Sequence, residues 1–264
     1  LLFEEPTIEK LSKALEAILR KINRNKNSLV PLLKKIENGG SKIPLSYAQQ
    51  RLWFLEALLP VSLYNIPIIV RFKGKLDTNL LVRAFKKVIE RHEILRTVFR
   101  KGDDGTTYQV ILKDIEAIEV INISNKVDQE KLIEKYKEEE IHKKFNLEQG
   151  PLISIKILIL DKQDYILLLT MHHIITDAWS VGILKDEVSK LYNSYITGEE
   201  IELDDLKVQY SDYSIWQREW LRGEALEKQL VYWKNKLDGI IDVINLPNDR
   251  VRPKELSYEG RRYS

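Results

Sequence analysis

Two apolar segments joined by a polar turn constrain the fold of this chain more than any other feature. Leu152 to Leu160 and Tyr165 to His172 are each of strand length, and polar residues around Lys162 and Gln163 separate them. Two strands joined by so short a turn pair as an antiparallel hairpin. No apolar run in the chain reaches the roughly 20 residues that a membrane-spanning helix needs. The sequence therefore predicts a soluble globular domain that contains this hairpin.

Helical and strand patterns interleave along the rest of the chain. Gly-Asp-Asp-Gly at 102–105 separates two further strand-like segments and predicts a second hairpin. Such hairpins favour antiparallel pairs within a mixed sheet, so of the α+β and α/β classes we expect an α+β, mixed-sheet, two-layer sandwich. The expected helices are 46–58, 77–90, 128–145, 177–195, 210–222 and 224–237, and the further strands are 66–72, 96–100, 106–112 and 120–123.

The first 42 residues differ in composition from the rest of the chain. Residues 7–20 place apolar side chains at helical spacing, which predicts a short amphipathic helix. Residues 21–42 mix Asn, Lys and Gly and include Pro31, which is typical of a linker. We therefore expect residues 1–20 to end one domain, residues 21–42 to form a linker, and the main domain to begin at about residue 43.

Charge and cysteine content exclude several classes of function. The chain has 42 basic and 40 acidic residues, and this near-balance gives no reason to expect nucleic acid or a membrane as a partner. It has no cysteine, which excludes disulfides, a thiol nucleophile and thiolate metal sites. We expect no metal site. The N-terminus also lacks the pattern of a secretory signal, so we expect a cytoplasmic protein.

An adjacent pair of histidines stands at the end of the second apolar segment. The stretch from Met171 to Ser180 reads MHHIITDAWS, and the chain has four histidines in all. Neighbouring residues of a strand face opposite sides of the sheet, so only one of His172 and His173 can point into a given cleft. Asp177 follows at the start of the next predicted helix, where a carboxylate caps the helix or pairs with Arg. Alone, this pattern suggests an acyltransferase or structural packing.

Three other segments make the pattern more specific. They read SYAQQRLWFL at 46–55, RHEILRTVF at 91–99 and YSDYSIW at 210–216. With MHHIITDAWS, they resemble the first four core motifs of nonribosomal peptide synthetase condensation domains in order and spacing. The first residues, LLFEEPTIEKLSKAL, resemble the last helix of a peptidyl carrier protein.

The resemblance implies a fold and a domain arrangement. The condensation family shares the fold of chloramphenicol acetyltransferase, in which two similar lobes flank a tunnel. Residues 43–222 would then form the N-terminal lobe. Residues 223–264 would begin a second, truncated lobe, and residues 1–20 would end the preceding carrier domain.

The resemblance also implies roles for the histidine motif. His173, the second His, would face the tunnel and act on the α-amino group of the acceptor. His172 would be mainly structural, although we include it in the catalytic set. Asp177 would form a salt bridge that shapes the loop.

Four further residues are implied as supporting ones. Arg96 comes from the second motif, and Trp179 and Ser180 follow the histidine motif. Ala178 departs from the family pattern, which has Gly at that position. Its backbone N–H is retained and could face a developing oxyanion. Its methyl group could crowd a backbone conformation that only Gly adopts with ease.

The implied reaction is aminolysis of a thioester, which makes the chain an acyltransferase-type enzyme. The amine of an aminoacyl group on a downstream carrier attacks a peptidyl thioester on an upstream carrier, and an adenylation domain lies nearby in the parent synthetase. No cofactor would bind directly, because both substrates arrive on 4'-phosphopantetheine arms. Freeing the amine lone pair at pH 7 costs only about 1–1.4 kcal/mol. Holding two reactants in line contributes up to roughly 7–11 kcal/mol.

Several other protein classes share part of this motif pattern. An epimerization domain would lack the SYAQQRLWFL form, a heterocyclization domain would have aspartates in place of the His pair, and a free-standing acyltransferase would lack the carrier-like start. The alternative that is not an enzyme is a truncated, catalytically inactive condensation-domain fragment with at most a carrier-docking role. RLWFL at 51–55 and YNIP at 64–67 favour the subtype that accepts an L-configured donor.

Overall fold

The computed structural model describes residues 30–36, 42–58, 63–240 and 247. The chain divides into two compact units, and each is described by itself. One holds the residues from Lys34 to Glu219, and the other holds Trp220 to Asp238. The predicted helix at 7–20 and most of the predicted linker at 21–42 lie outside the described residues.

A four-stranded mixed sheet is at the centre of the larger unit. Its order is β2-β7-β6-β5. Strand β7 pairs antiparallel with both β2 and β6, whereas β5 runs parallel to β6. The hairpin predicted from the two apolar segments is therefore present as β6 and β7. The strands are β2 (Asn65–Lys73), β5 (Ile118–Asn122), β6 (Ile153–Asp161) and β7 (Asp164–His172).

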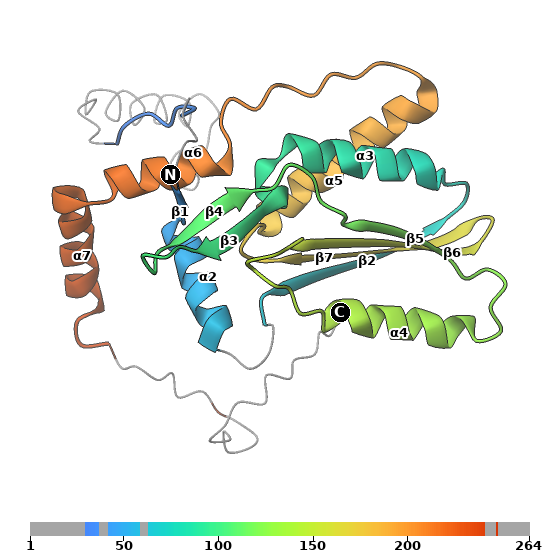
Figure 1. Ribbon diagram of the computed structural model, residues 1–264, viewed down its shortest axis with the longest axis horizontal. Coiled ribbons are helices and arrows are strands. Elements are labelled where there is room, and N and C mark those ends of the chain that lie inside the picture. Colours follow the sequence, from blue (N-terminus) through green and yellow to red (C-terminus); the bar gives the residue numbers. More distant parts are fainter. Residues whose placement is uncertain (1–29, 37–41, 59–62, 241–246, 248–264) are drawn as a thin grey trace, which may run out of the picture. The chain divides into compact units, whose positions relative to one another are not determined.

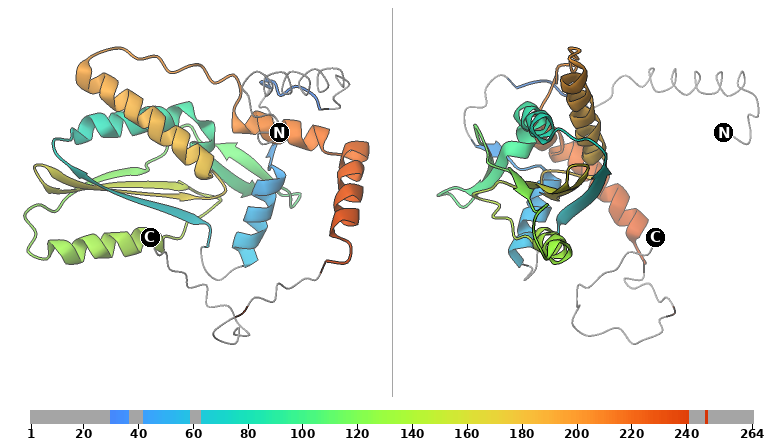
Figure 2. Two further views of the ribbon diagram at one scale, coloured as in Figure 1. Left: turned by 180° about the vertical axis from the view of Figure 1, so that it is seen from behind. Right: turned by 90° about the vertical axis from the view of Figure 1, so that its right-hand side faces the viewer.

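Helices cover both faces of this sheet (Figure 1). Helices α3 (Thr78–Arg91) and α5 (Ala178–Thr197) lie on one face, and α4 (Gln129–Ile141) lies on the other, as the view from behind also shows (Figure 2). The α+β class and the mixed sheet agree with the sequence prediction. The structure extends the two-layer description, because α4 adds a helix layer to the second face.

The reason for two helix layers lies in β6 and β7, whose side chains are apolar on both faces. On the α3–α5 face, Ile155 and Leu167 join the larger core cluster. On the α4 face, Leu158 and Leu168 join a smaller cluster with Ile133 of α4. Apolar area on both faces is stable only when both faces are covered. The two long strands are therefore almost fully buried along their length.

A small antiparallel sheet stands beside the larger one, with the order β1-β4-β3. The predicted Gly-Asp-Asp-Gly hairpin joins β3 to β4, and Gly105 has a φ of +77°, which glycine adopts without strain. Helix α2 follows β1 along the chain, and the short helical turn η1 precedes β3. The bounds are β1 (Ile43–Pro44), α2 (Tyr47–Leu58), η1 (Glu93–Arg96), β3 (Thr97–Lys101) and β4 (Thr107–Ile111).

The first and fourth motifs pack against one another. They form α2 and α6 (Tyr210–Trp220), and the Ser46 hydroxyl lies 3.0 Å from the Tyr210 hydroxyl. A buried chain of hydrogen bonds runs beside this contact: Gln49 donates to the Gln109 side chain at 3.2 Å, and Gln109 donates to the Ser214 hydroxyl at 3.0 Å. Two segments far apart in the sequence are thus fastened by polar side chains inside the fold.

The smaller unit contains helix α7 (Gly223–Leu237), in the place where the sequence predicts a helix. Every residue of α7 is at least partly exposed, and Tyr232 and Trp233 contact each other edge to face at 5.3 Å. Within the described residues, no helix has both the length and the apolar character needed to cross a bilayer.

Candidate active site

The turn that follows β7 places two adjacent imidazoles in different surroundings. Strand β7 ends at His172, a turn follows, and α5 begins at Ala178. The side chain of His172 is completely buried, whereas that of His173 is exposed. The alternation of side chains at a strand end accounts for this difference. One imidazole therefore belongs to the core and the other is open to solvent.

His172 is enclosed by aromatic rings and a carboxylate. Phe145 meets its ring edge to face at 6.3 Å between ring centres, and Tyr64 lies 6.4 Å away. Its Nδ1 accepts a hydrogen bond from the backbone N–H of Ile174 at 3.1 Å, and its Nε2 lies 3.5 Å from Oε2 of Glu56. Burial lowers the pKa of His172, and the Glu56 carboxylate acts in the opposite direction.

His173 is held by two backbone carbonyls. Its own N–H donates to the carbonyl of Tyr64 at 2.7 Å, and its Nδ1 lies 2.7 Å from the carbonyl oxygen of Thr176. A carbonyl oxygen can only accept, so Nδ1 carries the proton in this arrangement. The neutral ring then has its lone pair on Nε2. That atom is suited to take a proton from a reacting amine.

Asp177 begins helix α5 as its N-cap. Its Oδ1 accepts hydrogen bonds from the backbone N–H of Ser180 at 2.8 Å and from the Ser180 hydroxyl at 2.7 Å. These two donors lower the pKa of the Asp177 carboxyl. The cap fixes the point at which the histidine turn enters the helix.

Ala178 and Trp179 lie in the first turn of α5. The helical conformation there is one that Ala adopts without strain, so the expected crowding by its methyl group does not arise at this position. The Trp179 side chain is 81% exposed. The structure thus brings His173, Asp177, Ala178, Trp179 and Ser180 together at the surface end of one turn and helix, and their roles stay predictions.

Arg96 occupies a separate position from the histidine turn. Its guanidinium donates to the carbonyls of Ile89 and Glu90, each at 3.1 Å, and to those of Leu112 and Lys113 beyond β4. These bonds join the end of α3 to the end of β4. Its neighbour Leu95 lines a small hollow of about 90 Å³ together with residues of the histidine turn and α5. Arg96 therefore joins two backbone segments, and its supporting role in the site stays a prediction.

Two residues that the sequence did not single out belong to the same region. One is Glu56, the partner of His172. The other is Tyr210, because burial raises its pKa, and the charge of Asp177 adds to that effect. Tyr210 is the first residue of the motif at 210–216, so the motif could have indicated it as a site residue. Nothing in the local sequence of Glu56 indicates a contact with a residue more than one hundred positions away.

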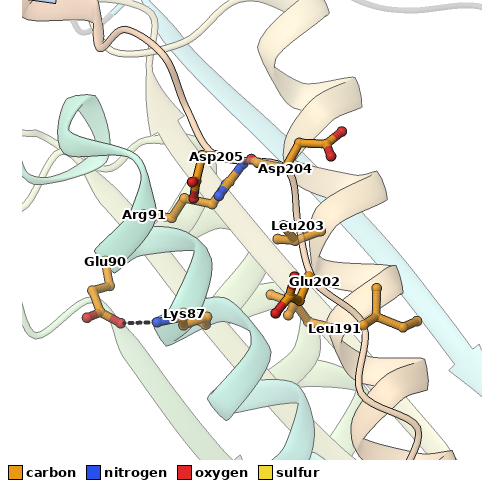
Figure 3. Close-up of a pocket in the computed structure, with 9 residues that line it drawn as sticks. Lys87, Glu90, Arg91, Leu191, Glu202, Leu203, Asp204 and Asp205 are labelled. Atoms are coloured by element: carbon orange, nitrogen blue, oxygen red, sulfur yellow. Dashed lines mark hydrogen bonds and ion pairs between the residues drawn. The ribbon is translucent and has the colours of Figure 1, made fainter.

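A second polar cluster lies at the end of α3. Glu187 of α5 contacts Arg91 at 3.2 Å and Nε2 of His92 at 2.6 Å. Arg91 also lines a hollow of about 740 Å³ between α3 and the segment 201–205, where Asp204 and Asp205 project (Figure 3). The residues that line this hollow come from α3, α5 and that segment, and the His172–Ser180 stretch contributes none of them in the described part of the chain.

The described residues contain no group of three or more His, Asp or Glu side chains placed to hold a metal ion. The arrangement at the end of β7 is instead an exposed imidazole with a fixed proton position, beside a capped helix N-terminus. Such a site can take up or give back a proton.

Comparisons with known proteins agree with the motifs. A condensation-domain family model matches residues 40–264. The chain is 40% identical over 264 residues to one of the linear gramicidin synthase subunits of Brevibacillus parabrevis, and 36% identical over 265 residues to a dimodular nonribosomal peptide synthase from Bacillus subtilis (strain 168). Each comparison covers 98% of this chain, but only 5% and 11% of those much longer proteins.

Solved structures show the same fold. The X-domain from teicoplanin biosynthesis superimposes with a TM-score of 0.71 at 28% identity, over 84% of this chain and 49% of that one. The starter condensation domain of rhizomide synthetase gives a TM-score of 0.69 at 20% identity, over 77% of this chain and 49% of that one. The chain thus spans about half of each solved domain. The α+β fold class and the chloramphenicol acetyltransferase-like lobe are confirmed.

Proposed function

Because this chain belongs to the condensation-domain family of nonribosomal peptide synthetases, we propose that it takes part in peptide-bond formation between carrier-bound substrates. The α-amine of an aminoacyl group on a downstream carrier attacks the thioester carbonyl of a peptidyl group on an upstream carrier. A C–N bond forms, the C–S bond breaks, and the upstream phosphopantetheine thiol is released. This is acyl transfer to nitrogen, with no covalent intermediate on the protein.

The observation that carries this proposal is the state of the His173 ring. Its Nδ1 proton is bound by the Thr176 carbonyl, so the lone pair of Nε2 is available at an exposed position. As the amine nitrogen bonds to the carbonyl carbon, it must lose a proton, or it is expelled again. His173 Nε2 receives that proton and returns it to the departing thiolate, which balances the reaction.

Positioning contributes more than proton transfer to the rate. Two tethered groups held end to end gain up to roughly 7–11 kcal/mol from proximity and orientation. A general base contributes about 10²- to 10⁴-fold, or roughly 3–5 kcal/mol. Asp177 and Ser180 support His173 by fixing the start of α5, and Arg96 supports the site through the backbone of η1 and α3.

We also propose the domain boundaries and partners that the resemblance implies. The family match from residue 40 and the compact unit from Lys34 to Glu219 support an N-terminal lobe at 43–222, followed by the start of a second lobe. Upstream and downstream carriers would deliver the phosphopantetheine arms, and an adjacent adenylation domain would select the monomer. The cytoplasmic location and the L-configured donor stay predictions, and no observation favours the docking-only alternative.

The test is a His173→Ala substitution in the natural polypeptide that carries this chain, assayed with loaded upstream and downstream carriers. Dipeptidyl product on the downstream carrier is followed by mass spectrometry. We expect its rate of formation to fall by about 10²- to 10⁴-fold.

The matched control is His142→Ala, since His142 is an exposed histidine on α4, with its side chain 75% exposed. This variant should keep the rate of the unmodified protein. An unchanged rate in His173→Ala would remove His173 from the mechanism.

A further inference from the structure

We infer that Glu56 is a positioning residue for His173 and acts through the buried ring of His172; this inference rests on the proposed function. Glu56 lies in the last turn of α2, directly after the first motif segment. Its side chain is 14% exposed, and its Oε2 lies 3.5 Å from Nε2 of the completely buried His172 ring. A carboxylate is therefore placed directly behind the strand end from which the candidate catalytic turn emerges.

The hydrogen bonds of His172 define which way this pair is oriented. Its Nδ1 accepts the N–H of Ile174, so the ring proton of the neutral imidazole resides on Nε2. That proton faces the Glu56 carboxylate. A separation of 3.5 Å is longer than an ordinary N–H···O hydrogen bond, so the carboxylate acts mainly by attracting the N–H dipole. The attraction keeps the ring in one tautomer and one orientation.

The backbone N–H held by His172 belongs to the residue directly after His173. Four hydrogen bonds hold this turn near His173: Ile174 N–H to the His172 ring, His173 N–H to the Tyr64 carbonyl, His173 Nδ1–H to the Thr176 carbonyl, and Ile175 N–H to the His172 carbonyl. The last three have backbone acceptors, whereas the first depends on the tautomer of a side chain. If His172 changed tautomer, its Nδ1–H would face the Ile174 N–H and the bond would be lost.

Glu56 thus sets the tautomer that holds the turn, and the turn fixes the tautomer of His173. The same logic orients metal-binding and catalytic histidines elsewhere, where a carboxylate on the far ring nitrogen fixes the near one. In this protein, the Glu56 carboxylate faces the ring of His172, which is the residue before His173, and not the His173 ring itself. Glu56 touches neither substrate nor the reacting atoms.

The kinetic test compares Glu56→Ala and Glu56→Gln in the natural polypeptide that carries this chain. The alanine variant removes the carboxylate that attracts the His172 N–H, so kcat should fall by about 10- to 100-fold while KM for both loaded carriers is unchanged. The glutamine variant keeps a partially negative oxygen facing the same N–H, and it should recover part of the lost rate. An unchanged kcat in Glu56→Ala overturns the inference.

The chain offers a matched control in an exposed carboxylate–histidine pair. Glu138 lies 3.2 Å from Nε2 of His142, and both side chains are largely exposed. Glu138→Gln should leave kcat unchanged. If Glu56→Ala does not fold, Glu56→Met replaces it, because Met has a similar length and no negatively charged oxygen to attract the N–H.

A spectroscopic test separates this inference from the proposed function. The full chain is labelled with ¹⁵N at its four histidines, and the ring nitrogen shifts report each tautomer by NMR. We expect His172 as the Nε2–H form and His173 as the Nδ1–H form, both retained in Glu56→Gln. In Glu56→Ala or Glu56→Met, His173 should become a mixture of tautomers.

A single Nδ1–H form of His173 in those apolar variants overturns the positioning role, whatever the enzyme activity. Absence of condensation by the unmodified polypeptide, with the tautomers as expected, would count against the proposed function and leave the role of Glu56 in the turn supported.

Discussion

The two ends of strand β7 hold ionisable side chains in opposite surroundings. At the first residue of β7, the Asp164 carboxylate accepts two hydrogen bonds from Arg71, from Nε at 2.9 Å and from Nη2 at 2.7 Å. It also accepts one from Lys73 Nζ at 2.7 Å. The two cationic side chains are largely exposed. At the last residue of β7, the His172 ring is fully enclosed and faces Glu56.

This contrast shows that polar pairs at the two ends of one strand differ in how much they stabilise the fold. Ion pairs in solvent are screened, and their side chains can separate at little cost. A buried carboxylate and imidazole cannot separate without leaving polar groups in an apolar environment. The ion pairs at the open end of β7 therefore add little to stability, whereas the buried pair at the closed end holds a turn in one conformation.

The strongest way to break this contrast is to remove the buried ring. His172→Ala deletes a fully enclosed side chain, removes the ring that faces Glu56, and takes away the acceptor of the Ile174 N–H. We expect the free energy of unfolding to fall by about 3 kcal/mol, measured by urea denaturation of the full chain. A loss below about 1 kcal/mol would show that the closed end is no more demanding than the open one.

Acidification tests the same end of the strand without a large deletion. Burial lowers the pKa of His172 below its ordinary value of about 6.5, so the unfolded state binds this proton first as the pH falls. The free energy of unfolding should then decrease from about pH 6.5 downward, by at most about 1.4 kcal/mol for each pH unit from this one group.

The measurement for this prediction is urea denaturation at pH 7.5, 6.5 and 5.5, on the unmodified chain and on His172→Asn. The other three histidines are present in both proteins, so the difference between the two slopes isolates His172. Equal slopes would contradict the prediction.

Asp177 lies at the closed end of β7 but is itself exposed, so it sharpens the contrast. Asp177→Ala removes the N-cap of α5, and we expect the free energy of unfolding to fall by about 1 kcal/mol. Asp177→Asn retains a capping side chain and should be close to the unmodified chain. Chemical denaturation of the two variants side by side checks this, and an equal loss in both would show that charge, and not capping, is what matters.

The smallest effect is expected at the open end. Asp164→Asn removes the charge that Arg71 and Lys73 share, and the free energy of unfolding should stay within about 1 kcal/mol of the unmodified chain. The rate of condensation in the natural polypeptide should not change. A loss of activity here would mean that the two ends of β7 are coupled.

Local patterns were sufficient for most of the fold. The apolar segments predicted β6 and β7. The helix predicted at 77–90 is present as α3, and Asp77 caps it by accepting from the N–H groups of Asn79 and Leu80. The end of the helix predicted at 128–145 was less accurate, since α4 ends at Ile141. The parallel pairing of β5 with β6 was also not predicted, because nothing within five residues of strand specifies a partner.

The candidate site was predictable where residues are neighbours in the sequence. The alternation of a strand end separates His172 from His173, and Asp177 stands where an N-cap belongs. The Glu56 contact could not be found in this way, because it depends on how α2 packs against the end of β7. The four carbonyls around Arg96 likewise come from segments that only the folded chain brings together.

The hydroxyl contact between Ser46 and Tyr210 spans 164 positions of the chain. During synthesis at about 5–20 residues per second, Ser46 leaves the peptidyl-transferase centre roughly 8–33 s before Tyr210 is added. Throughout that interval Ser46 lacks the Tyr210 hydroxyl as a partner, and such non-local pairings are slow to form in any case. The contact that fastens the first motif to the fourth can therefore form only late in synthesis, after both segments have been made.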